Sequence, residues 1–239
     1  MLIAGFPAGA FAANCYIVAP APGAECVIID PGQDAERGIE ELLARYRLKP
    51  IAVLLTHGHL DHMWSVGPVC GAKGIPAYIH PGDRALLADP ARGLSLAASQ
   101  QFFGGNLSFT EPDDVQELSD EATITLAGLD FAVSHVPGHT EGSVTFRSQE
   151  DGADPDGASA DAARPLDVLF AGDLLFAGSV GRTDLPGGDH RKMLRSLART
   201  LTLPDEVIVL PGHGPQTTIG AERVSNPFLH GLQPAQKGL

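Results

Sequence analysis

The sequence predicts a layered α/β protein in which two β-sheets are enclosed between helices. Apolar runs typical of strands occur in clusters in both halves of the chain, and amphipathic segments with helical spacing fall between them. With 239 residues, 44% of them hydrophobic, the chain is long enough to bury a substantial core. We expect a single domain over residues 1–239.

The first half of the chain supplies strands and one long helix. Residues 15–20 and 24–30 are rich in apolar and β-branched side chains and are separated by a Pro/Gly turn, which predicts paired strands. Residues 34–48 have apolar side chains at helical spacing and predict an amphipathic helix. A continuous apolar run at 51–56 is typical of a strand buried on both faces, and residues 74–80 predict a further short strand.

The middle of the chain is less regular. Pro81 and Gly82 predict a turn, and residues 84–90 predict a short helix after it. The stretch from Gly93 to Pro112 has no clean hydrophobic period. We interpret this stretch as a loop over one face of the protein.

The second half repeats the alternation of strands and helices. It predicts a hairpin, two strands, an amphipathic helix and a last strand, at residues 122–137, 143–148, 167–173, 190–201 and 206–214. The segment at about 148–167 is rich in Ala, Asp, Gly and Pro and has almost no bulky apolar residue. Because such a segment buries too little to order itself, we predict a flexible surface insertion there.

Composition narrows the function classes. The net charge of -13 argues against a nucleic-acid partner and against binding to an anionic membrane surface. Three cysteines without a CxxC pair make a disulfide framework or a thiolate zinc site improbable, which favours a reducing cytoplasm. The apolar N-terminus lacks the basic region of a signal peptide and is too short for a membrane span, so it predicts a first strand or hairpin.

A dense group of metal-ligand side chains follows the strand at 51–56. Within six residues the chain supplies His57, His59, Asp61 and His62, and imidazole and carboxylate are ligands that zinc and similar ions accept. Residues two apart on an extended segment point the same way, so His57 and His59 can reach one ion. If the chain then turns into a helix, Asp61 and His62 project elsewhere and can reach a second ion.

Three further donors lie at strand ends, each flanked by Gly or Pro. They are His139 in the stretch VSHVPGHT, Asp173 in VLFAGD and His213 in VIVLPGHG. Sites in layered α/β proteins tend to form at strand ends, where loops converge. We therefore expect these donors to meet the first group in one centre.

The order HxHxDH, PGHT, GD and GHG resembles the metallo-β-lactamase superfamily over most of the chain, from about Asn14 to Phe228. The resemblance implies an αββα four-layer sandwich with the site at one edge. It also implies two sets of metal ligands joined by a bridging aspartate, namely His57, His59 and His139; Asp61, His62 and His213; and Asp173 between them. Asp30, in VIIDPG, matches a strand-end aspartate that supports the ligands rather than binding metal.

Within the superfamily, residues 171–190 and 207–229 resemble the short glyoxalase II-like hydrolases of bacteria, which act on hydroxyacyl thioesters such as S-lactoylglutathione. Arg182 stands where a basic residue contacts the thiol cofactor, although a surface salt bridge would explain it nearly as well. Because the chain ends soon after His213, we expect the C-terminal helical domain of longer relatives to be absent. Pro215 replaces the family's aromatic residue after the last metal histidine, so another low-molecular-weight thiol is also compatible.

The implied chemistry is hydrolysis of a small-molecule thioester with two divalent ions. Zinc is the default for His/Asp donors, and iron and manganese accept the same set. We expect Asp61 and Asp173 to orient an activated water that attacks the carbonyl. The departing thiolate has a pKa near ~8.5 and needs no strong general acid. Neither the acyl group nor the oligomeric state follows from the sequence.

Two alternatives stay open. Persulfide dioxygenases look similar in the same motifs but use a single iron held by two histidines and an aspartate, whereas the GGDH and GHGP stretches here favour the hydrolase. A scaffold without chemistry conflicts with the complete set of seven donors. True β-lactamase activity fits less well, since the GRTD loop is more typical of the thioesterase branch.

Several other polar residues are expected to be structural or exposed. This group contains His80, His135, His190 and His230, which lie outside the ligand pattern. We expect His135 to pack on its strand and His190 to open a helix. Cys15 fits the core better than it fits a nucleophile. Asn14 could approach the site through its turn, but it fits a structural turn better.

Overall fold

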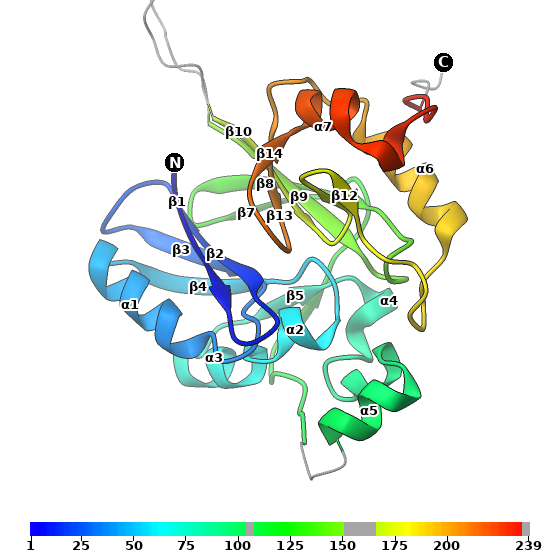
Figure 1. Ribbon diagram of the computed structural model, residues 1–239. Helices are drawn as coiled ribbons and strands as arrows, with labels where there is room; N and C mark the ends of the chain where they lie inside the picture. The colour runs from blue at the N-terminus through cyan, green and yellow to red at the C-terminus, as the bar shows by residue number, and fades with distance from the viewer. Residues whose placement is uncertain (104–107, 151–165, 236–239) are drawn as a thin grey trace, which may run out of the picture.

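The computed structural model describes residues 1–103, 108–150 and 166–235. Two six-stranded sheets pack face to face, and helices cover their outer faces (Figure 1). This is the predicted αββα four-layer sandwich. Most of the predicted insertion at 148–167 lies outside the described residues, between a strand that ends at Gln149 and one that begins at Asp167.

The first sheet contains the N-terminal half of the chain in sequential order. Its strands are β1 (Leu2–Ala8), β2 (Ala13–Ala19), β3 (Glu25–Ile29), β4 (Lys49–Leu54), β5 (Ala77–Ile79) and β6 (Val115–Glu117). The first three pair antiparallel and the rest parallel. The crossovers that parallel pairing requires carry α1 (Glu36–Tyr46), α2 (Leu60–Met63) and α3 (Val66–Lys73). The apolar N-terminus is therefore a strand, as predicted.

The second sheet contains the C-terminal half. Its order is β14 (Thr217–Thr218), β13 (Ile208–Pro211), β10 (Asp167–Gly172), β9 (Val144–Gln149), β8 (Leu129–His135) and β7 (Thr123–Leu126). The two parallel strands, β10 and β13, are connected through the ribbon β11 (Leu175–Phe176) and β12 (Ser179–Val180) and through α6 (His190–Thr200). The chain then continues into α7 (Ile219–Ser225) and a 3-10 turn, η2 (Pro227–Leu229).

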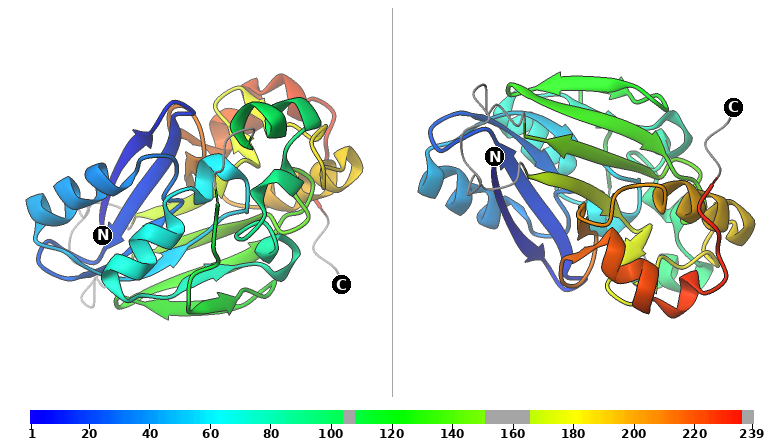
Figure 2. Two further views of the ribbon diagram at one scale, coloured as in Figure 1. Left: turned by 90° about the horizontal axis from the view of Figure 1, so that it is seen from below. Right: turned by 90° about the horizontal axis from the view of Figure 1, so that it is seen from above.

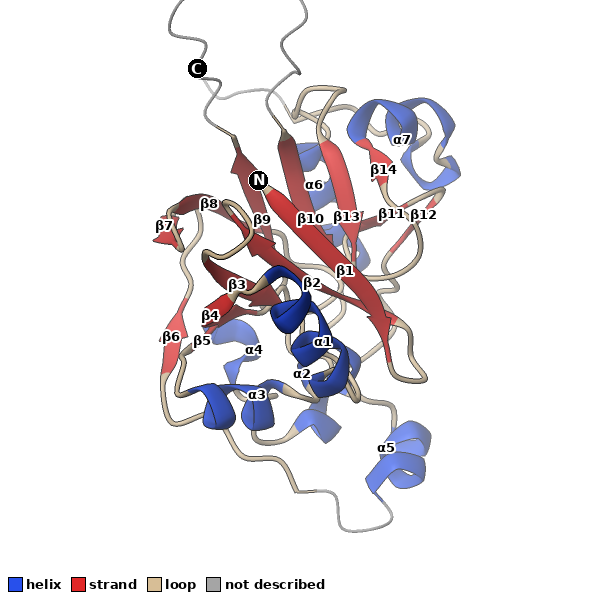
Figure 3. Ribbon diagram, turned by 90° about the vertical axis from the view of Figure 1, so that its left-hand side faces the viewer, coloured by secondary structure: helices blue, strands red, loops and turns tan. Residues whose placement is uncertain are grey.

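Three apolar clusters separate the four layers. Because side chains alternate along a strand, Val27 and Ile29 of β3 face the second sheet while Ile28 faces the helices. Phe131 and Phe170 fill the space between the sheets. Figure 2 shows α1 and α3 across the outer face of the first sheet, and α6 and α7 on the far side of the second. Figure 3 shows the same arrangement, with strands inside and helices outside.

The irregular middle of the chain differs from the prediction at two places. The helix expected at 84–90 instead begins at Pro81 and ends at Arg84, as α4. Proline is favoured at the first helical position, since its missing N–H has no partner there in any case. The predicted loop after Gly93 contains α5 (Leu96–Phe103), which the Ser95 hydroxyl caps by accepting from the Ala98 N–H at 3.3 Å.

The structure bears on two further expectations from composition. Cys15, Cys26 and Cys70 are free and buried, so no disulfide joins them. Among the residues that the structure describes, no helix has both the length and the apolar character needed to cross a membrane.

Candidate metal centre

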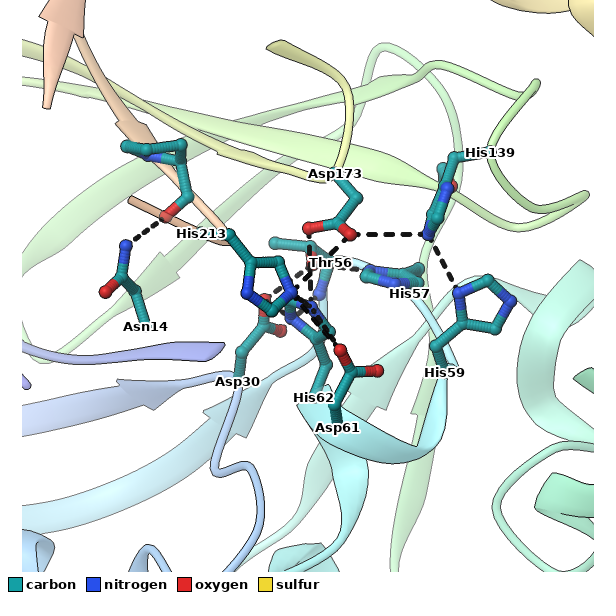
Figure 4. A network of polar contacts seen from close by, with 12 residues as sticks. Asn14, Asp30, Thr56, His57, His59, Asp61, His62, His139, Asp173 and His213 are labelled. Atoms are coloured by element: carbon teal, nitrogen blue, oxygen red, sulfur yellow. Dashed lines mark hydrogen bonds and ion pairs between the residues drawn. The ribbon is translucent and has the colours of Figure 1, made fainter. Parts of the chain in front are cut away.

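The HxHxDH segment changes conformation in its middle, and this change divides its donors into two directions. It leaves β4 in an extended form as far as His59, whose φ of -67° and ψ of 147° precede the first turn of α2. His57 and His59 consequently meet His139, while Asp61 and His62, on the helix, meet His213 (Figure 4). The two pairs adjoin, since ligand atoms of His57, His62 and Asp30 also lie within 4.8 Å of one another. The helix that the two-direction prediction required after His59 is therefore present, as α2.

The first group of donors consists of His57, His59 and His139, whose ligand atoms lie within 4.8 Å of one another. His59 Nδ1 lies 2.8 Å from His139 Nε2. His57 Nε2 is buried and has no hydrogen-bond partner among the described residues. All three side chains are at most 5% exposed. Three imidazole nitrogens that converge in a buried space, one of them unpartnered, fit a bound cation.

The second group consists of Asp61, His62 and His213, again within 4.8 Å of one another. His213 Nε2 lies 3.2 Å from Asp61 Oδ2 and 3.3 Å from His62 Nε2. The side chains of Asp61 and His213 are 25% and 30% exposed, so this group opens toward solvent.

Asp173 lies between the two groups. Its Oδ1 is 3.3 Å from His62 Nε2, and its Oδ2 is 3.5 Å from His139 Nε2. One carboxylate thus faces a histidine of each group, as a bridging ligand must. All seven residues that the sequence predicted as ligands are therefore brought together.

The protonation of the cluster suits metal binding. Burial lowers the pKa of His59 to about 3 and also lowers the pKa of His57, so both imidazoles are neutral and offer a lone pair. Burial alone would raise the pKa of Asp61 and Asp173, but the nearby histidines, His62 foremost, lower both, so both carboxylates are ionised. Burial alone would lower the pKa of His62 and His213, but the carboxylates of Asp61 and Asp173 raise both, so an ion that binds the second group displaces protons. The donor set fits two divalent ions of the zinc, iron or manganese type.

Backbone and hydroxyl groups orient the first group. His139 Nδ1 donates to the backbone carbonyl of Arg182 at 2.8 Å, which aims Nε2 at the cluster. His57 Nδ1 lies 3.1 Å from Thr56 Oγ1.

Asp30 lies where the predicted supporting role requires it. Its Oδ1 accepts from the Thr56 N–H at 2.8 Å, and its Oδ2 accepts from Thr56 Oγ1 at 2.6 Å. The same Oδ2 lies 3.0 Å from His62 Nδ1, which leaves His62 Nε2 for a metal. The residue adopts a left-handed φ of 50°, an uncommon conformation outside glycine that turns the carboxylate toward both partners.

Asp83 is a buried carboxylate that the sequence analysis missed. Its Oδ2 accepts from the Gly58 N–H at 2.8 Å and from Thr140 Oγ1 at 2.7 Å, and its Oδ1 accepts from the Gly142 N–H at 2.7 Å. It joins the segment that carries His57 to the loop that carries His139. Its only sequence signal is its place just after a strand end, which many aspartates share.

Asn14 has a more specific place than the predicted structural turn, which was wrong. It lies in β2, and its Nδ2 donates to the carbonyls of Pro211 and Gly214 at 3.0 and 2.9 Å. Its backbone N–H donates to Gly212 O at 2.7 Å. These bonds bracket His213 on both sides and tie its loop to the first sheet.

The discounted residues lie outside the cluster. His80 and His135 stack on each other, with ring centroids 4.0 Å apart, so His135 packs as expected. His190 is the exposed first residue of α6, and His230 is exposed. Cys15 is fully buried, and burial raises the pKa of its thiol, which makes it a poor nucleophile.

A cavity of about 430 Å³ opens over the cluster. Apart from ligands of the two groups, it is lined by Phe11, Leu60, Leu94, Phe176, Val180, Arg182 and Leu185. Arg182 lines the cavity as predicted, but its guanidinium makes two hydrogen bonds of 2.7 Å to the carboxylate of Asp184. The salt bridge that the sequence left open is thus present, and the contact of Arg182 with a thiol stays a prediction.

A layered αββα fold with a His/Asp cluster at the strand ends defines a metal-binding class of proteins. The family model described as the metallo-beta-lactamase superfamily matches residues 8–153 and 163–213. The chain therefore belongs to this superfamily, whose members are mostly hydrolases.

Two relatives cover nearly the whole chain. An uncharacterized protein of Mycobacterium tuberculosis is 48% identical, over 97% of this chain and 99% of its own length. The hydroxyacylglutathione hydrolase GloC of Haemophilus influenzae is 35% identical, over 94% of this chain and 96% of its own length.

Two solved structures share the fold at 39% identity. The B3 metallo-beta-lactamase BLEG-1 has a TM-score of 0.79 over 96% of this chain and 100% of that chain. The protein TTHA1623, in a di-iron-bound form, has a TM-score of 0.72 over 95% of this chain and 100% of that chain.

Proposed function

We propose that this protein is a binuclear metal-dependent hydrolase that cleaves a hydroxyacyl thioester of a low-molecular-weight thiol. The observation that carries the proposal is the pair of donor groups, with Asp173 between them, at the base of a substrate-sized cavity. The likeness to GloC over nearly the whole chain supports a thioester of this kind.

The residues of the cavity suit attack by water rather than by a side chain. No Ser, Thr or Cys is among the described residues that line it. Bound divalent ions would supply a water of lowered pKa and a Lewis acid for the carbonyl oxygen. Asp173, which faces both groups, and Asp61, beside the opening, are placed to accept hydrogen bonds from that water and to fix its direction. A thiolate leaves without a proton donor, so this reaction requires no general acid.

The choice between the hydrolase and the mononuclear iron dioxygenase rests on sequence likeness rather than on the geometry of the donor groups. The dioxygenases share nearly all of these site residues, so the convergence of Asp61, His62 and His213 is compatible with both enzymes. The GGDH and GHGP stretches and the likeness to GloC over nearly the whole chain favour the hydrolase. The proposed ions are zinc, iron or manganese. The donor set favours zinc, whereas the likeness to TTHA1623, solved in a di-iron-bound form, favours iron.

A second candidate reaction is hydrolysis of a β-lactam, which the likeness to BLEG-1 favours. The same centre could attack a lactam carbonyl, whose nitrogen leaves less readily than a thiolate. We therefore rank thioesters first.

The first test combines metal content with activity. We expect close to two ions per chain, hydrolysis of S-D-lactoylglutathione, slower turnover of the β-lactam nitrocefin and no substrate-dependent oxygen uptake. The variant His59→Ala should abolish hydrolysis with an unchanged circular dichroism spectrum, while the matched variant His230→Ala, at an exposed histidine, should keep full activity. One iron per chain with oxygen uptake, or full activity in His59→Ala, would contradict the proposal.

A further inference from the structure

Resting on the proposed function, we infer that the thiol half of the substrate is uncharged and apolar, rather than an anionic peptide thiol such as glutathione. The inference comes from the walls of the cavity above the metal centre. The walls are mostly apolar, whereas a thiol carrier with two carboxylates needs basic or hydrogen-bonding side chains.

The walls are mostly apolar and incompletely covered. Phe11, Leu94, Phe176, Val180 and Leu185 line the cavity and are only partly buried. They come from separate segments: the β1–β2 turn, the end of η1 (Pro90–Gly93), the β11–β12 ribbon and the loop before α6. Apolar side chains that converge from several loops onto one opening are typical of a site completed by an apolar ligand.

Away from the metal ligands, the walls offer little net charge to attract carboxylates. Arg182 is the one arginine or lysine among the described lining residues, and its Nε and Nη2 donate to the carboxylate of Asp184. The pair has no net charge, so its remaining N–H groups attract an anion less than those of an unpaired guanidinium would. Lys192, on helix α6, is likewise paired with Glu141 at 2.8 Å. The chain as a whole carries -13, which also disfavours anions.

The experiment holds the acyl group constant and changes the thiol. The metal-loaded enzyme is given D-lactoyl thioesters of glutathione, of N-acetylcysteamine and of benzyl mercaptan, which are anionic, neutral and neutral with an apolar ring. Each kcat/KM is divided by the rate of hydroxide hydrolysis of the same ester, which removes differences in intrinsic reactivity. We expect the benzyl mercaptan ester to exceed the glutathione ester by about tenfold, and at least by threefold, with N-acetylcysteamine between them.

Two variants of residues at the cavity, Phe176→Ser and Asp184→Asn, test whether its walls cause this preference, and a third variant is the control. Phe176→Ser should lower the benzyl-to-glutathione ratio by about fivefold, since it removes an apolar wall. The matched variant Phe228→Ser, at an exposed phenylalanine outside the lining, should leave the ratio unchanged. Asp184→Asn should release Arg182 and raise kcat/KM for the glutathione ester about threefold at low ionic strength.

The outcomes separate the two claims. If all three esters are hydrolysed and the benzyl ester leads by less than threefold, or if Phe176→Ser and Phe228→Ser change the ratio equally, the inference about the carrier is wrong and the thioesterase stands. If none of the esters is hydrolysed by enzyme that holds two ions, the proposed function itself is wrong.

Discussion

The two donor groups of the centre differ in their burial and in what supports them. His57, His59 and His139 are almost completely enclosed, whereas Asp61 and His213 are a quarter or more exposed at their side chains. The enclosed group is held by contacts within a compact region, including the Asp83 bridge between its two segments. The open group depends on a contact between the first and last parts of the chain, through Asn14.

This contrast predicts that the two donor groups retain bound ions for different times. Buried donors with fixed ring orientation need little rearrangement to bind, while exposed donors compete with water and move more freely. We therefore expect the enclosed group to keep its ion longer when a chelator is added.

The largest effect should separate the two groups directly. His213→Ala should leave about one ion per chain, whereas His57→Ala should lose the retained ion and reduce the metal content further. Both should lower kcat by on the order of 10²–10³-fold or more, because an incomplete centre stabilises the developing charge poorly. Elemental analysis after dialysis against a mild chelator measures the difference. Equal metal content in the two variants would show that the groups do not differ in retention.

Asp83→Asn should have an intermediate effect, because an amide cannot accept all three of the hydrogen bonds that the carboxylate accepts. We expect the affinity of the enclosed group for metal to fall about 10–100-fold, and the free energy of unfolding of the metal-free protein to fall by about 1–3 kcal/mol. A competition titration with a chromogenic chelator and a urea melt measure these two quantities. The exposed variant Asp89→Asn is the control. A loss of stability without a loss of metal affinity would limit Asp83 to a structural role.

Smaller effects should come from Asn14→Ala and Tyr16→Phe. Asn14→Ala loosens the loop of His213, while Tyr16 still donates to Pro211 O at 2.8 Å. We expect roughly tenfold weaker binding of the second ion only. Tyr16→Phe removes the other bond to the same carbonyl and should weaken it less, because the Asn14 bond to Gly214 stays. Stepwise metal titration followed by activity distinguishes the two ions. The comparison would be contradicted if Asn14→Ala weakened the first ion equally.

The sequence predicted those parts of the fold and the centre that depend on local pattern. Apolar runs located the β-strands whose ends carry the donors, and the spacing of His57, His59, Asp61 and His62 encoded their two directions through a local change of conformation. Asp83 escaped prediction because its role depends on partners from two distant segments. Asn14 escaped for the same reason, since its carbonyl partners lie 197 and 200 residues away in the chain.

The helices at 81–84 and 96–103 show a different limit. Pro81 followed by Gly82 is compatible with both a turn and a helix start, and the choice depends on His80, whose ring accepts the Gly82 N–H at 3.1 Å. Over a short segment, such contacts rather than hydrophobic periodicity decide whether the chain forms a turn or a helix.

The pairing of Asn14 in β2 with the loop of His213 has a consequence for biosynthesis. As the chain emerges from the ribosome, the donors of the enclosed group are all available once the loop of His139 has appeared. The open group requires a residue more than seventy positions later, which then has to dock on β2, made about 200 residues before it. On the proposed function, a second ion could be loaded only after the loop of His213 has been made, so a chain interrupted before that loop would display a half-assembled centre.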